Sequence, residues 1–203
     1  GSASVIAANA WMNSPSGFEL DSTGKVVEVD PMAVIFNDGM PLASLLGYGD
    51  AAFTDCMTRG PKLLPQHVCV FGARSYEPEE RALLDRIGVR VIGMREIERR
   101  GLSDTLEEAL GIVRRAEGGY GLTIDMDALD PRDAPGVGTP APGGLRAARL
   151  IPALEPIGSD PCLAALEIAE YNPHRDRLGV TRQHAIALAA RVQHIALQAA
   201  RLD

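Results

Sequence analysis

Two carboxylates stand two residues apart at the end of an apolar run, in the segment LTIDMD of residues 122–127. Side chains alternate between the two faces of a strand, so Asp125 and Asp127 are expected to point the same way from its tip. Residues 134–144, which follow, are rich in proline and glycine and predict a rigid loop. Carboxylates that share a face can bind a hard or borderline divalent cation, so this segment is a candidate metal site.

A structural interpretation of the same two residues stands beside the metal site. Without a cation, the like charges of Asp125 and Asp127 would repel each other, and one carboxyl group would tend to keep its proton. In that case the pair would serve to accept hydrogen bonds from nearby loop amides. The residues of this segment alone leave both interpretations open.

The elements that must position this site alternate in type along the chain. Apolar runs predict strands at residues 5–8, 68–72, 89–92 and 163–169, besides the one that ends at the carboxylates. Helical spacing and capping residues predict helices over 77–87, 103–117 and 145–157, the last in two pieces because of Pro152, and one from a Thr181 cap nearly to the end. Residues 18–36 suggest a hairpin or extended excursion.

Alternating strands and helices predict an α/β fold, with a mainly parallel sheet covered on both faces. Ligands in such sheets lie beyond the carboxyl ends of the strands. Glu170 directly follows the last predicted strand. We therefore expect Glu170 at the same edge of the sheet as Asp125 and Asp127.

Composition limits the class of protein. A length of 203 residues fits a single domain over 1–203, with Gly1 and Ser2 left out of the fold argument as a possible tag remnant. The net charge of -7 disfavours nucleic acid and anionic membranes as partners. Three cysteines far apart along the chain indicate buried reduced thiols, and no stretch reaches transmembrane length, so a cytoplasmic location is expected.

Residues 122–144 closely resemble the last metal-binding signature of the ureohydrolases, the arginase/agmatinase/formiminoglutamase family. Further segments similar to that family are 39–43, 70–75 together with Glu79 or Glu80, and 167–173. The resemblance implies an arginase-like three-layer αβα fold lacking the family's N-terminal strands. It also implies Mn2+ as the metal, bound as a pair of ions, and Glu170 as the residue that binds the guanidinium group of a substrate.

The departures from the family pattern fall on the chemistry. Where the family has Asp-Ala-His-x-Asp, this chain reads Asn9-Ala10-Trp11-Met12-Asn13, and an indole cannot ligate a metal. Asp38 replaces a histidine that lies near the substrate in the family, and the family's Gly-Gly-Asp-His segment has no counterpart. Of the side chains that would hold two metals, Asp125 and Asp127 remain. We read Asn9, Trp11 and Asn13 as positions of lost ligands.

Three functional hypotheses follow. In the first, the protein is catalytically inactive and serves as a structural or regulatory subunit, with no cofactor, or with Mn2+ if any metal is bound. In the second, it is an amidinohydrolase that releases urea from a guanidino compound once one metal or a partner chain completes its site. In the third, it binds a cationic guanidine or amine without metal, through Glu170 and Asp38.

The resemblance also bears on partners. In the family, the strands that precede the segment resembled by this chain lie at one side of the sheet. Without them, a strand edge would expose unpaired amides and carbonyls. We therefore predict a homo-oligomer, or a complex with a second chain that covers this edge.

Overall fold

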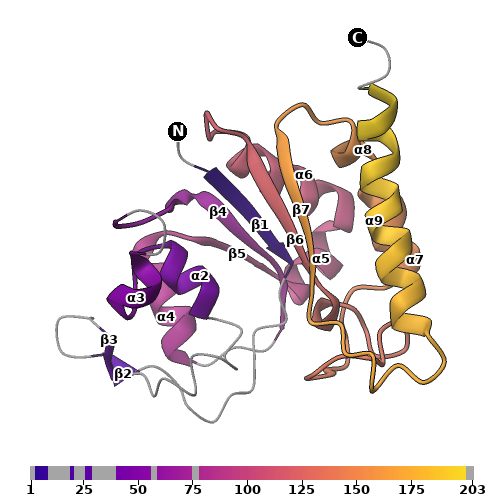
Figure 1. Cartoon of the computed structure of the whole chain (residues 1–203), viewed down its shortest axis with the longest axis horizontal. Helices are drawn as coiled ribbons and strands as arrows, with labels where there is room; N and C mark the ends of the chain where they lie inside the picture. Colours follow the sequence, from indigo (N-terminus) through magenta and orange to yellow (C-terminus); the bar gives the residue numbers. More distant parts are fainter. Residues whose placement is uncertain are drawn as a thin grey trace.

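Five parallel strands form the central sheet of the computed structural model (Figure 1). The structure describes residues 3–8, 19–20, 26–28, 40–55, 59–74 and 78–199. The strand order is β5-β4-β1-β6-β7. The strands are β1 (Ala3–Ala8), β4 (Leu63–Ala73), β5 (Arg90–Gly93), β6 (Tyr120–Asp125) and β7 (Leu163–Ala169). Each pair of neighbours runs parallel, as the alternation of elements predicts.

Helices lie on both faces of this sheet, which confirms the predicted α/β layers. They are α2 (Met40–Leu45), α3 (Ala51–Thr54), α4 (Pro78–Ile87), α5 (Met94–Arg100), α6 (Leu102–Val113), α7 (Ala147–Ala153), α8 (Glu155–Gly158) and α9 (Val180–Ala199). A short antiparallel pair, β2 (Glu19–Leu20) and β3 (Val26–Glu28), lies within the predicted hairpin region.

Each face of the sheet has its own hydrophobic core. On one face, alternate residues of β6, namely Tyr120, Leu122 and Ile124, pack with side chains from α5 to α9. On the other face, Val68 and Val70 of β4 pack with side chains from α2, α4 and β5. The alternation of buried residues between two cores is the period of two that a strand covered on both faces requires.

Two predicted helix boundaries are wrong. The helix predicted over 103–117 begins at Leu102 and ends at Val113, because the amides of Arg115 and Ala116 bond carbonyls three residues back and tighten the last turn. Thr181 lies inside α9 rather than capping it. Asp176 takes that role, since its carboxylate accepts hydrogen bonds from the amides of Thr181 at 3.2 Å and Arg182 at 2.9 Å. The predicted break near Pro152 is confirmed by the separate helices α7 and α8.

β7 is an edge strand, and one face of the sheet beside it is exposed. Ala165 and Glu167 of β7 pair in register with Gly121 and Thr123 of β6, on the face opposite α9. Both β7 residues are exposed, and the hydroxyl of Thr123 donates to Glu167 Oε2 at 3.0 Å. Within the described ranges, the helices α2 and α4 cover this face only over β4 and β5. The sheet is therefore less covered at β7 than a parallel sheet usually is.

The sequence predicts buried thiols and a cytoplasmic location, and the cysteines and helices of the structure can be compared with these predictions. Cys69 is buried, and burial raises the pKa of its thiol to about 12, whereas Cys162 is half-buried. Of the two cysteines that the structure describes, Cys69 therefore agrees with the prediction of buried thiols. Cys56 lies outside the described residues. Among the helices described, none has the length and apolar character needed to cross a bilayer. A cytoplasmic location stays a prediction.

Candidate functional site

The two carboxylates lie at the carboxyl end of β6, where both are buried. They belong to different elements, although only Met126 separates them in the sequence. Asp125 ends β6, while Asp127 lies in the 3-10 turn η1 (Met126–Ala128), and each is only 2% exposed. The expected continuous strand through both residues is therefore wrong. The chain turns after Asp125 because Asp125 Oδ1 accepts a hydrogen bond from the amide of Asp127 at 2.7 Å. Asp127 Oδ2 accepts one from the amide of Thr139 at 3.3 Å.

These contacts confirm that both carboxylates bind loop amides, as the structural interpretation predicts. Acceptance of amide hydrogen bonds stabilises the charged form of a carboxylate and so offsets part of the repulsion between neighbouring ones. It does not exclude a metal, because a carboxylate has about four lone-pair positions. Both interpretations of the pair therefore remain compatible with its geometry.

The loop after the pair is held in place from several directions. The amide of Gly136 donates to Thr181 Oγ1 at 2.7 Å, and Arg175 Nη1 donates to the carbonyl of Gly138 at 2.8 Å. Asp130 accepts the amide of Gly143 at 3.1 Å and the side chain of Arg132 at 2.7 Å. The Arg132 guanidinium lowers the pKa of Asp130, although burial opposes the shift. These hydrogen bonds hold the loop at several points, which agrees with the predicted rigid loop.

Arg74 joins the end of β4 to this loop. Its guanidinium donates to the backbone carbonyls of Asp127, Ala128, Leu129 and Ala141. Burial lowers the pKa of Arg74, while the charges of Asp127, Asp125 and Asp130 oppose that shift. A positively charged side chain therefore lies within electrostatic reach of the two candidate ligands.

Glu170 lies beside the same loop, as expected from its position after β7. A Cβ atom built on Gly138 would be 3.6 Å from Glu170 Oε2, which places this carboxylate next to the residue that precedes Thr139. Glu170 also has a φ of 61°, the only positive value among the non-glycine residues that the structure describes. Such a backbone conformation costs free energy for a residue with a side chain and is concentrated at functional sites. The structure thus brings Glu170 and Asp127 to one loop.

Four predicted site residues, Asn9, Trp11, Asn13 and Asp38, lie outside the described residues. The strand before Asn9 is described, and its last residue, Ala8, pairs with Ile124 of β6. The strand β1, which precedes Asn9, and the strand β6, which ends at Asp125, therefore finish next to each other at the carboxyl end of the sheet. This agrees with the expectation that residues after both strands contribute to one site.

Comparison with known proteins places this geometry in a family. The model of the Arginase family matches residues 29–194. The chain belongs to the arginase family. Similar proteins include the arginase of Brevibacillus brevis, 40% identical over 154 residues that make up 76% of this chain and 52% of the relative. This chain spans about half the length of the curated arginases it matches.

Solved arginases share the fold. The crystal structure of arginase from Bacillus subtilis superposes with a TM-score of 0.79 at 32% sequence identity, covering 94% of this chain and 62% of that one. Native arginase from Bacillus caldovelox has the same TM-score and identity, with 94% and 60% covered. These likenesses confirm the arginase-like α/β fold that the sequence motifs predict.

A pair of manganese ions does not fit the residues that the structure describes. By the resemblance above, a dinuclear site would need further ligands besides Asp125 and Asp127, the two that β6 and η1 supply. Over the described ranges, no group of three or more histidine, cysteine, aspartate or glutamate side chains is placed to hold a metal ion. The described part of this arginase-family chain therefore offers two carboxylates to a cation.

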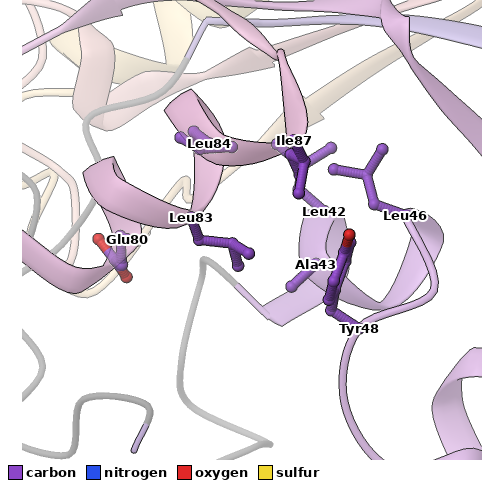
Figure 2. A pocket seen from close by; sticks show the side chains of 8 residues that line it. All are labelled: Leu42, Ala43, Leu46, Tyr48, Glu80, Leu83, Leu84 and Ile87. Atoms are coloured by element: carbon purple, nitrogen blue, oxygen red, sulfur yellow. The ribbon is translucent and has the colours of Figure 1, made fainter. Parts of the chain in front are cut away.

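A separate pocket between α2 and α4 does not provide a ligand site. Figure 2 shows its lining, in which aliphatic side chains from the two helices face each other beside Tyr48, with Glu80 at one end. The cavity measures about 10 Å³, which is room for one water molecule. The candidate site of this arginase-family chain thus stays at the carboxyl ends of β6 and β7.

Sequence reasoning missed the residues that hold the loop. Arg74, Thr139 and Arg175 carry no periodic or spacing signal for such contacts, although Arg74 belongs to a segment already similar to the family. Arg146 pairs with Asp133 at 2.8 Å, and Arg74 donates to carbonyl groups.

Proposed function

We propose that this chain is an arginase-family protein that does not release urea by itself and acts as a structural or regulatory subunit. The observation that carries the proposal is the sequence at residues 9–13, where two amides and an indole replace three expected ligands. The pair that remains, Asp125 and Asp127, is buried and already accepts backbone amides. In this proposal the pair binds no more than one Mn2+ ion, and weakly.

The chemistry of the family explains why so few ligands would be insufficient. Attack on a guanidinium carbon needs a strong nucleophile at neutral pH, and a bound metal would supply one by lowering the pKa of its water to about 7. Two carboxylates and water can hold a single hard cation, but they supply too few charged ligands for two. A weakly bound single ion would leave most copies of the site empty, and water there would keep its ordinary pKa and stay too weakly acidic to react.

Metal content and urea release test the proposal together. After incubation with Mn2+, we expect no more than one ion per chain by elemental analysis, and no urea from arginine or agmatine above background. Asp125→Asn should lower the residual Mn2+ affinity by at least about tenfold, because the replacement removes one of two charged ligands. Asp85→Asn, at an exposed carboxylate on α4, is the matched control and should change nothing. Two tightly bound ions with turnover by the chain alone would contradict the proposal.

A metal-free binding function is the second candidate. It is supported by the place of Glu170 beside Gly138 and by its positive φ, which together hold a carboxylate at the loop of the site. A guanidine or amine could then be bound by charge-assisted hydrogen bonds, with Asp38 as a second counter-charge. Calorimetric titration with agmatine in the presence of a chelator distinguishes this binder from an inert subunit. The remaining alternative, an amidinohydrolase completed by a partner chain, requires urea release that appears only when the partner is added.

We further propose that β7 binds protein, either a second copy of this chain or a second polypeptide. Its support is the edge position of β7 and the exposure of Ala164, Ala165 and Glu167. An unprotected edge presents amides and carbonyls for pairing with another strand, and natural edges are often blocked with lysine.

Light scattering tests the homo-oligomeric form. We expect the purified chain to show a mass above its 21.6 kDa, and the double variant Ala164→Lys/Ala165→Lys to shift it towards the monomer. Ala82→Lys, on the exposed side of α4, is the control and should leave the mass unchanged. A wild-type chain that stays monomeric at high concentration would count against self-association.

A further inference from the structure

We propose that Arg74 is the positioning residue of the Asp125–Asp127 pair, holding both the turn that carries Asp127 and the loop that faces it. The inference rests on the proposed function to the extent that the pair still binds one Mn2+ ion. It adds a residue that directly follows a third strand, β4, to a site otherwise formed at the ends of β6 and β7.

Arg74 follows the last residue of β4 and reaches two segments that are far away in sequence. Its Nη1 donates to the carbonyl of Ala128 at 3.2 Å, and its Nη2 donates to the carbonyls of Asp127 and of Leu129, the latter at 3.3 Å. Nε and Nη2 also donate to the carbonyl of Ala141, at 3.2 and 2.9 Å. One side chain therefore ties the turn η1 to the far side of the loop.

Through these bonds, Arg74 affects the positions of Asp125 and Asp127 relative to each other. The turn held by Arg74 contains Asp127, and the loop that contains Ala141 also contains Thr139, whose amide donates to Asp127 Oδ2. Asp125 is tied to the same turn through the amide of Asp127. Loss of the guanidinium would remove the bonds that tie the turn η1 to Ala141 and would loosen these elements relative to each other. Outer contacts of this kind commonly change metal affinity by 10–100-fold.

Other arginines near the loop serve different partners. Arg132 and Arg146 bind the carboxylates of Asp130 and Asp133, through two nitrogen atoms each. Arg74, by contrast, makes its described hydrogen bonds to backbone carbonyls around the turn of the site. The planar guanidinium presents five donors in a fixed fork, and a lysine ammonium cannot reach the same set of acceptors at once.

The charge of Arg74 also suits its place. Arg74 is half-buried, and withdrawal of a guanidinium from water is costly unless its donors are satisfied and anions are near. Here four carbonyls accept its hydrogen bonds, and the charges of Asp125 and Asp127 favour its charged form. Arg74→Lys keeps the charge and removes the fork. It therefore separates positioning from simple charge compensation.

The test compares the full chain with its Arg74→Lys and Arg81→Lys variants. Mn2+ alone is the probe, with its free concentration followed by electron paramagnetic resonance. Arg74→Lys should weaken Mn2+ binding about tenfold while cooperative thermal unfolding persists. The control Arg81→Lys, at an arginine of α4 whose side chain is 37% exposed and pairs with Asp85, should bind Mn2+ as the wild type does.

Hydrogen exchange without metal provides the second readout. Arg74→Lys should accelerate exchange of the Thr139 amide, and Arg81→Lys should leave it unchanged. Unaltered Mn2+ affinity or unaltered Thr139 exchange in Arg74→Lys would overturn the inference. If the wild type binds no Mn2+, the residual cation site of the proposed function is refuted, and Thr139 exchange alone then decides the role of Arg74. Arg74→Gln repeats both measurements should the lysine variant fail to fold.

Discussion

The triple replacement Asn9→Asp, Trp11→His and Asn13→Asp is expected to raise the affinity of the chain for Mn2+ by at least about 100-fold. Loss of an outer contact alone commonly changes metal affinity by 10–100-fold, and three direct ligands should contribute more. The strand before Asn9 ends beside the strand before Asp125, so the restored side chains would start at the correct edge of the sheet. Elemental analysis and Mn2+ titration measure the gain.

Addition of Asp125→Asn to the triple variant provides the matched control. It should reverse most of the gain, because restored and original ligands would then no longer share one ion. Full urea release is not expected from the triple variant, since by the resemblance Asp38 replaces a histidine expected close to the substrate. A triple variant that folds but gains no Mn2+ affinity would refute the matching of residues 9–13 to the family's ligand segment.

Gly144→Ala is expected to destabilise the folded chain by about 3 kcal/mol, the upper end of the usual cost of overpacking. A Cβ at this position would lie 2.5 Å from the carbonyl carbon of Leu129, 2.7 Å from the oxygen of Ala128 and 2.7 Å from the nitrogen of Asp130. All three are backbone atoms, so no side chain can rotate away. The free energy of unfolding, measured by urea denaturation, gives the effect.

The same replacement should also disturb the site. Leu145 donates to the carbonyl of Ala128 at 2.9 Å and accepts from the amide of Asp130 at 2.9 Å, so displacement of Gly144 moves the turn next to Asp127. Gly111→Ala, in α6, meets open space and should instead stabilise the chain by about 0.5–1 kcal/mol. Equal stability of Gly144→Ala and the wild type would show that this close backbone contact is absent.

Part of the fold could be predicted because it depends on local patterns. Alternating apolar residues in β6 and the apolar run of β7 indicate strands, and the proline in α7 indicates where the helical segment divides. The helices α2 and α3 were not predicted as elements, since each is only six residues or fewer and offers a weak periodic signal. The boundaries of α6 and α9 were misplaced because hydrogen bonds from turns and from Asp176 decide them.

The candidate site divides in the same way. Asp125, Asp127 and Glu170 could be predicted because each follows a strand of a parallel sheet. The bend between Asp125 and Asp127 could not, since it comes from one carboxylate that binds an amide two residues later. The match of Asn9, Trp11, Asn13 and Asp38 to the family rests on the sequence, because these residues lie outside the described ranges.

The sequence by itself determined the alternation of the longer strands and helices, the carboxylate pair and the identity of the residues at positions 9, 11 and 13, because side-chain identity and periodicity are local properties. Only the tertiary structure decided that Arg74 meets Ala141, that Glu170 lies beside Gly138 and that β7 exposes one face. These contacts join residues from different strands, and they form only where the folded sheet brings the strand ends together.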